Sequence, residues 1–225
     1  MVTSEGELHG HSSASAQPVP DDPTGVYCWA LAGTALSYAL LHHLGLLPAG
    51  IGPALEGTRW ADWLDLAVPW LVLVPAAVTM WAAPASTRSW AIFGAGVVAY
   101  SSGHGVHLAA NSVSNASPGP TAHLWDEVVS HYVWFAGVAL VLAALMHTMV
   151  GRSRPHPAGY VLAVAVGVTW ATNAVGGGTV IVSFAVAIAA SIFGWTRRRE
   201  LGRVMLVGFL PAVAILAGEL VRQAT

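Results

Sequence analysis

Polar and ionisable side chains gather in two neighbouring apolar stretches of this chain. Within each stretch most of them are three or four residues apart, a spacing that lines them up along one face of a helix. The two arrays are Tyr100, His104, His107 and Asn111, and then His123, Asp126, Glu127 and His131. Ionisable groups are costly inside a membrane and mark a functional site there. Imidazoles beside a carboxylate form the donor set that suits zinc, iron, copper or nickel.

The two arrays are expected to face each other, because a short linker joins the two stretches and makes them antiparallel. At the rise and twist of an α-helix, His104 falls near the depth of His131, and His107 falls near Glu127. We therefore predict that residues from both stretches hold one ion. The candidate ligands are His104, His107, Glu127, His131, His123 and, from an earlier stretch, His42.

Other polar residues are expected to support this site. Asp126 points about 100° away from Glu127 on a helical wheel. We interpret it as a helix N-terminal charge or as a partner for another helix. Asp65 would orient a ligand imidazole from behind. His42 and His43 are also about 100° apart, so only one of them is expected to point inward.

Composition places the two arrays in a membrane protein. The 225 residues are 55% hydrophobic and only 9% charged, whereas a soluble domain has about 25% charged residues. The apolar residues come in blocks of about twenty, enough to span a bilayer as helix. A net charge of −2 gives no electrostatic basis for binding nucleic acid. Lysine is absent, which excludes a rhodopsin-type retinal protein because its Schiff base requires one.

We predict an all-α bundle of seven transmembrane helices. Residues 1–24 are polar and proline-rich and are expected to form a disordered tail, while residues 25–225 form a single transmembrane domain. The predicted spans are 26–47, 64–83, 90–113, 124–150, 157–175, 179–195 and 204–221. The linkers between them are rich in proline, glycine or arginine, as expected of loops.

Arginine predicts the orientation of the bundle. Seven of the nine arginines lie in the second, fourth and sixth linkers, and only Arg59 lies in an odd-numbered linker. The positive-inside rule then makes the even linkers cytoplasmic, with the N-terminus in the cytoplasm and the C-terminus outside. Both polar arrays fall in the outer half of the bundle. We expect an integral protein of a bacterial plasma membrane, with its polar site facing the extracytoplasmic side.

The leading functional hypothesis is a zinc-type hydrolase. A catalytic zinc uses three protein ligands and a water whose pKa falls to about 7, and it polarises a carbonyl or phosphoryl group. Glu127 or Asp126 would serve as general base, and Tyr100 or Asn111 would donate to a developing oxyanion. The site would lie roughly 10 Å below the outer surface between apolar helices. Its substrate is therefore expected to be a lipid-like molecule from the outer leaflet.

The predicted architecture resembles the seven-helix intramembrane hydrolases that include the alkaline ceramidases and the adiponectin receptors. The resemblance implies zinc held by histidines from early and final helices, including a His-x3-His pair in the last one. This chain has no His-x3-His pair and no histidine in its seventh predicted span. The resemblance is one of class rather than of motif, and no residue role is carried over from it.

A membrane oxidoreductase is the alternative enzyme. His104 and His131, at matching depth, would ligate a haem, and Gly103, Gly105 and Gly137 would leave room for the macrocycle. A copper or iron oxygenase acting on a hydrocarbon dissolved in the membrane is a second form of this hypothesis. A di-iron site is weaker, because that pattern needs two Glu-x2-His motifs and this stretch has one Glu-x3-His.

The third hypothesis is a non-catalytic polar network in a structural or transport protein. A lone intramembrane histidine such as His147 is expected to hydrogen-bond a neighbouring helix. Asp62 and Asp65 most simply cap the second span, and Glu219 with Arg222 forms an interfacial ion pair. Transport is disfavoured, because the inner half of the bundle offers only His147 and the chain shows neither broken helices at the midplane nor repeat symmetry.

Overall fold

The structure is a computed structural model that describes residues 25–44, 51–55 and 58–225. Over these residues the chain is helical, and its only β-pairing is an isolated bridge between Pro53 and Arg59. The all-α prediction is confirmed. The predicted tail, 1–24, and the last residues of the first predicted span, 45–47, lie outside the described residues.

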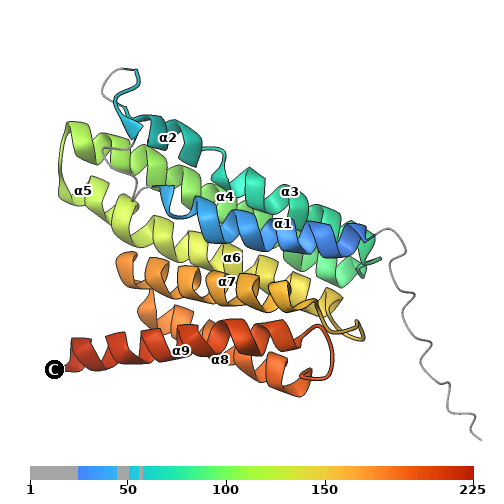
Figure 1. Cartoon of the computed structure of the whole chain (residues 1–225). Helices are drawn as coiled ribbons and strands as arrows, with labels where there is room; N and C mark the ends of the chain where they lie inside the picture. The colour runs from blue at the N-terminus through green and yellow to red at the C-terminus, as the bar shows by residue number, and fades with distance from the viewer. Residues whose placement is uncertain (1–24, 45–50, 56–57) are drawn as a thin grey trace, which may run out of the picture.

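The helices occupy all seven predicted spans. In chain order they are α1 Val26–Leu41, α2 Trp60–Asp65, α3 Val68–Ala82, α4 Thr87–Ala116, α5 Pro120–His123, the π-helical segment η3 Leu124–Val129, α6 Ser130–Thr148, α7 Pro157–Gly176, α8 Val180–Thr196 and α9 Arg203–Ala224. The second span is made of α2 and α3, and the fourth runs continuously through α5, η3 and α6. Figure 1 shows these elements as long rods lying side by side.

Four helical stretches are long and apolar enough to cross a membrane. They are Trp60–Ala82, Pro120–Thr148, Pro157–Gly176 and Arg203–Ala224, while α1 and α8 are apolar but shorter. The long helix α4 falls outside this group because serine, histidine and asparagine interrupt its apolar sequence. These helices are compatible with an integral membrane protein. The seven-span topology and the placement of the two termini remain predictions.

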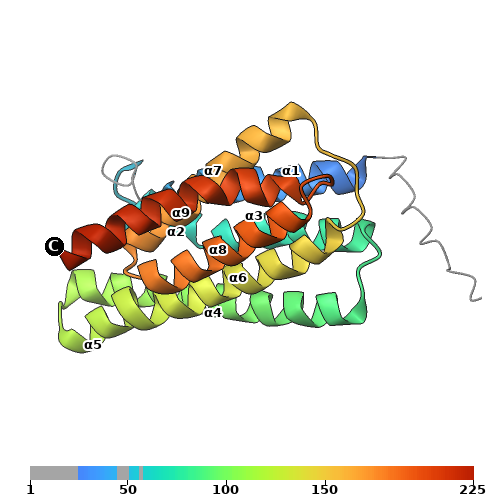
Figure 2. The ribbon, with the colours of Figure 1, turned by 90° about the horizontal axis from the view of Figure 1, so that it is seen from below.

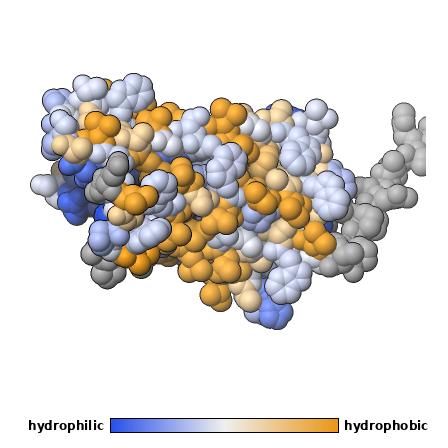
Figure 3. All heavy atoms as spheres, turned by 90° about the horizontal axis from the view of Figure 1, so that it is seen from above, coloured by the Kyte–Doolittle hydropathy of each residue, from blue (hydrophilic) through white to orange (hydrophobic). Residues whose placement is uncertain are grey.

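The surface of the bundle carries large apolar side chains whose exposure to water would be unfavourable. Trp29, Trp81, Ile181 and Val161 are all more than two-thirds exposed. Apolar side chains cover the middle of the face seen in Figure 3, and hydrophilic ones gather toward its ends. Continuous exposed apolar surface of this kind marks an interface with another molecule or with lipid.

Local signals in the sequence set the helix ends. Ser86 accepts a hydrogen bond from the Ser89 backbone N–H at 3.2 Å and so caps the start of α4. Pro157 is the first residue of α7, where its missing N–H costs nothing. Gly178 has a φ of +66°, a conformation that glycine adopts without strain, and it turns the chain from α7 into α8.

Helices α4 and α6 are in backbone contact, and Figure 2 shows them side by side along one edge of the bundle. A Cβ atom at Gly103 would overlap the backbone of Trp134, and one at Gly137 would overlap the backbone of Tyr100. Small residues allow this close approach, as is typical of helix pairs in membranes. The contact places both polar arrays on one interface.

Candidate functional site

Four histidines gather round one indole, that of Trp134 on α6. Their ring centroids lie 5.4, 5.1, 6.2 and 5.8 Å from the indole, in the order His42, His104, His107 and His131. We call these four residues the histidine cluster. The cluster draws on the end of α1, on α4 and on α6, so the predicted convergence of the two stretches is observed.

His107 of α4 and His131 of α6 form the closest pair of rings between the two arrays. Their centroids lie 4.9 Å apart. The expected register placed His107 opposite Glu127 and His104 opposite His131. The observed pairing of His107 with His131 therefore differs from that expectation by about one helical turn.

The carboxylate that faces the cluster is that of Asp126. Its Oδ1 atom lies 2.9 Å from Nδ1 of His107, and its side chain is almost fully buried. The Glu127 side chain is 45% exposed instead. The prediction that Asp126 points away from the cluster is wrong. Glu127 shares a side of the helix with His131 as predicted, since its Oε2 atom lies 3.9 Å from Nδ1 of His131.

The π-helical segment η3 accounts for the inward position of Asp126. Its hydrogen bonds run from residue i to i+5, so each residue turns the helix by less than the 100° of an α-helix. A helical wheel that counts back from His131 at 100° per residue therefore gives the wrong direction for the Asp126 side chain. The Ser130 hydroxyl donates to the Asp126 backbone carbonyl within this segment. Single π-helical turns occur frequently at functional sites.

Hydrogen bonding fixes the tautomers of His107 and His131. Nδ1 of His131 lies 2.8 Å from the Glu127 backbone carbonyl, which only accepts, so Nδ1 carries the proton. Nδ1 of His107 is likewise surrounded by acceptors, the carboxylate of Asp126 and its backbone carbonyl at 3.4 Å. Each ring therefore presents Nε2 as an unprotonated lone pair, and neither Nε2 atom is hydrogen-bonded within the described residues.

His104 has the other tautomer, in which Nε2 carries the proton. Its Nε2 atom lies 2.9 Å from the backbone carbonyl of Asp65 and 3.3 Å from the Asp65 carboxylate. Its Nδ1 atom is buried and has no hydrogen-bond partner within the described residues. Asp65 therefore orients the imidazole of His104, as predicted from the sequence.

His42 and His43 point to different places. Nε2 of His42 accepts from the Tyr100 hydroxyl at 2.7 Å, while its Nδ1 donates to the Tyr38 carbonyl at 3.0 Å. His43 reaches the hydroxyl of Thr169 on α7 at 3.1 Å. Of the two, His42 therefore lies in the histidine cluster, and His43 contacts α7 instead. Because the Tyr100 hydroxyl is used on His42, it is not free to act as an oxyanion donor in this arrangement.

Two predicted site residues, His123 and Asn111, lie apart from the cluster. His123 is exposed on α5. Asn111 accepts from Asn115 at 3.0 Å on the outer part of α4. Asp62 has the predicted capping role, because it accepts from the Arg59 backbone at 2.8 Å. Hydrogen bonds from the Arg59 guanidinium to this carboxylate raise the pKa of Arg59.

Two neighbours of the cluster were missed in the sequence. Trp134 follows His131 by three residues, a spacing that places both on one face of α6, so the signal was present. The second neighbour is Gly177, in the turn between α7 and α8. A Cβ there would lie 3.1 Å from Cγ of His131, so the turn between α7 and α8 packs against the imidazole.

No protein-family model, curated protein or solved structure matches this chain. The function must therefore be argued from the chemistry of the site itself.

The donor set at the cluster fits a transition metal, although the side chains do not enclose one in this arrangement. Among the residues that the structure describes, no group of three or more His, Cys, Asp or Glu side chains is placed to hold an ion. The lone pairs of His107 and His131, with a buried carboxylate beside them, are the ligand types of two-histidine, one-carboxylate sites. An anchored Nδ1–H is the usual state of a metal-binding histidine.

The glycines do not make room for a haem. Gly103 and Gly137 are in contact with the facing helix, and the Trp134 indole lies against both His104 and His131. Only Gly105 has open space beside it. The predicted space for a macrocycle between α4 and α6 is therefore filled by protein.

Proposed function

We propose that this chain is a membrane-embedded, metal-dependent enzyme that hydrolyses a lipid-like substrate. The observation that carries the proposal is the His107 and His131 pair, with ring centroids 4.9 Å apart and both Nδ1 atoms beside oxygen acceptors. Two imidazoles on one tetrahedral ion, with bonds of about 2.0–2.1 Å, have centroids roughly 5 Å apart. The spacing suits a shared ion.

His107 and His131 would hold the ion, with Asp126 as the adjacent carboxylate. Such an ion supplies a polarised substrate oxygen and an acidified water. The residues of the chain supply orientation: Asp126 fixes the His107 ring, and the Glu127 carbonyl fixes the His131 ring. Burial of Asp126 makes its interaction with His107 stronger than it would be in water.

The surroundings of η3 favour a lipid-like substrate. Leu124, Trp125 and Val128 on this segment are each at least 40% exposed. The carboxylate of Asp126 is therefore one residue away from side chains that would face the acyl chains of a bilayer. A molecule dissolved in the membrane can approach the cluster from that side, in agreement with the proposed outer-leaflet origin of the substrate.

The contact between His107 and Asp126 favours a second candidate, a metal-free acid–base enzyme. A carboxylate on Nδ1 of a histidine is the arrangement that orients a general base in many hydrolases. In this candidate Nε2 of His107 would take a proton from water or from a substrate hydroxyl. A copper or iron oxidoreductase would use the same donors as the zinc form, so the identity of the metal decides between them.

Metal analysis of the purified full-length protein tests the proposal. We expect about one equivalent of zinc per chain, since a catalytic zinc site holds a single ion. The His107→Ala and His131→Ala variants should each lose it. His147→Ala is the matched control, because His147 contacts Ser89 at 3.4 Å, away from the cluster. A metal-free wild-type protein would overturn the metal proposal, and bound iron or copper would replace hydrolysis by oxidation.

A further inference from the structure

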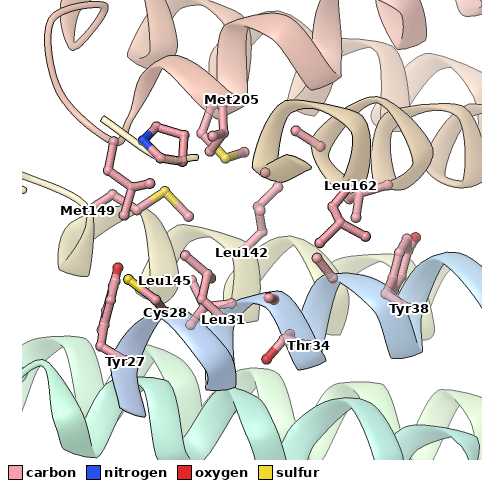
Figure 4. Close-up of a pocket in the computed structure, with 18 of the residues that line it drawn as sticks. Tyr27, Cys28, Leu31, Thr34, Tyr38, Leu142, Leu145, Met149, Leu162 and Met205 are labelled. Atoms are coloured by element: carbon pink, nitrogen blue, oxygen red, sulfur yellow. The ribbon is translucent and has the colours of Figure 1, made fainter. Parts of the chain in front are cut away.

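A large cavity of different chemistry lies between α1, α6, α7 and α9. Its volume is about 710 Å³, which falls within the range of roughly 300–1,000 Å³ for small-molecule sites. Figure 4 shows Leu31 of α1, Leu142 and Leu145 of α6, and Leu162 of α7 around the space. The lining of α1 extends from Tyr27 to Tyr38. That span covers about 16 Å at the rise of an α-helix.

One end of this cavity is cationic. The linker between α6 and α7 contributes Arg152, Arg154 and His156 to the lining, next to the apolar residues of the helices. Neither arginine is paired with a carboxylate within the described residues. Glu200 of the adjacent linker accepts from the Gly151 backbone at 2.8 Å and lies 3.6 Å from Arg197.

Arg152 is held in place at the mouth of the cavity. Its guanidinium carbon lies 3.7 Å from the centroid of the Tyr27 ring, and its Nε atom donates to the Thr148 carbonyl at 2.9 Å. These contacts use one N–H of the guanidinium and one of its faces. The remaining N–H groups stay available to an anion, and a guanidinium binds phosphate through a two-pronged contact.

We propose that this cavity binds an anionic phospholipid, with an acyl chain between α1, α6 and α7 and the phosphate against Arg152 and Arg154. An apolar channel about 16 Å long with cations at one end is complementary to a charged amphiphile. A free phosphate would leave the apolar lining of the cavity exposed to water. A zwitterionic lipid would place its own cation beside the arginines. The arginine-bearing linker is predicted to be cytoplasmic, so the lipid would come from the inner leaflet.

This lipid site is separate from the histidine cluster. None of the four cluster histidines is part of the cavity lining. Tyr100 lines the far end of the cavity, and its hydroxyl donates to His42 at 2.7 Å. The bound lipid would therefore contact the back of the cluster through Tyr100 without entering it. The inference does not depend on metal binding or catalysis.

Lipid titration of the full-length protein in phosphatidylcholine nanodiscs tests the site. The probe is phosphatidylglycerol with a spin label near the end of one acyl chain, and labelled phosphatidylcholine is the reference. We expect the wild-type protein to immobilise phosphatidylglycerol in preference to phosphatidylcholine. The Arg152→Gln/Arg154→Gln double variant should lose at least ten-fold in affinity, since each arginine near an anionic headgroup contributes roughly five-fold.

Two further variants separate the charge from the cavity. The Arg198→Gln/Arg199→Gln double variant makes the same change in charge in the linker between α8 and α9, outside the cavity, where Arg198 lies over Trp195, and it should leave the affinity unchanged. Leu142→Trp should fill the cavity and reduce the binding of both labelled lipids. His107→Ala should keep the preference for phosphatidylglycerol even if it has lost a metal ion.

Three results would overturn the lipid site. They are equal immobilisation of the two lipids by the wild-type protein, an equal loss of affinity in the two arginine double variants, and competition by inorganic phosphate at the lipid concentration. The last result would identify a simple anion site. A fourth result, binding of phosphatidylglycerol by Leu142→Trp as tight as by the wild-type protein, would place the lipid outside the cavity.

Discussion

Nδ1 of His107 on α4 lies 2.9 Å from Oδ1 of Asp126 on the π-helical segment η3. The contact joins the two arrays of polar residues across the interface between α4 and the fourth span. It places a buried carboxylate behind an imidazole whose Nε2 lone pair has no partner within the described residues. This is the arrangement in which a second residue orients a metal ligand or a general base.

The first prediction concerns the charge of Asp126. Asp126→Asn keeps the size of the side chain but removes the negative charge behind His107. We expect a loss of about 10–100-fold in metal affinity, the usual effect of removing such a partner. Titration with zinc in competition with a chelator measures it. Glu200→Gln makes the same kind of change in the linker between α8 and α9, away from the cluster, and should stay near the wild-type value. An equal loss in both variants would contradict the assignment.

The second prediction concerns the contact between α4 and α6. Gly103→Ala would force a Cβ atom into the Trp134 backbone and separate the helices. We expect a destabilisation of about 1–3 kcal/mol, typical of overpacking, seen as a lower midpoint of thermal unfolding in detergent. Gly105→Ala is the control, because no atom lies within 4 Å of a Cβ there. Equal midpoints for the two variants would refute the close packing.

The third prediction concerns the hydrogen bond from Tyr100 to His42. Tyr100→Phe leaves Nε2 of His42 without its donor at a buried position. We expect a cost of about 1–3 kcal/mol, measured by reversible unfolding in mixed micelles. Tyr132→Phe, at an exposed position of α6, should unfold like the wild-type protein. If the two variants have the same stability, the bond does not contribute.

The fourth prediction concerns the orientation of the bundle. Reporter fusions at Gly119, before α5, should be active only in the extracytoplasmic space, because the third linker carries no arginine. Fusions at Arg198, between α8 and α9, should report the cytoplasm. A cytoplasmic signal at Gly119 would invert the topology and place the histidine cluster in the inner half of the membrane.

The positions of the helices could be predicted because apolar blocks between arginine- or glycine-rich linkers are visible in the sequence. That α4 and α6 face each other could be predicted from their short linker and from helical geometry. The end of α1 could not be predicted in this way: the helix stops at Leu41, before the two histidines, although the predicted span ran on to residue 47. Hydropathy reports burial in lipid, not the backbone conformation that ends a helix.

The finer geometry of the site depended on features that the sequence does not mark. A π-helical turn at η3 brings Asp126 toward His107, and residue type alone does not reveal that turn. Gly103 and Gly137 were interpreted as open space, whereas they are contact points between helices. A glycine leaves room, but only the structure determines whether a ligand or a backbone fills it.

X-ray absorption spectroscopy at the zinc edge of the purified wild-type protein tests the shared ion most directly. We predict one zinc site whose first shell holds two imidazole nitrogens at about 2.0–2.1 Å, and a His131→Ala variant that lacks this shell. A protein purified without metal, or a double His107→Ala/His131→Ala variant that retains the wild-type spectrum, would contradict the proposed metal site.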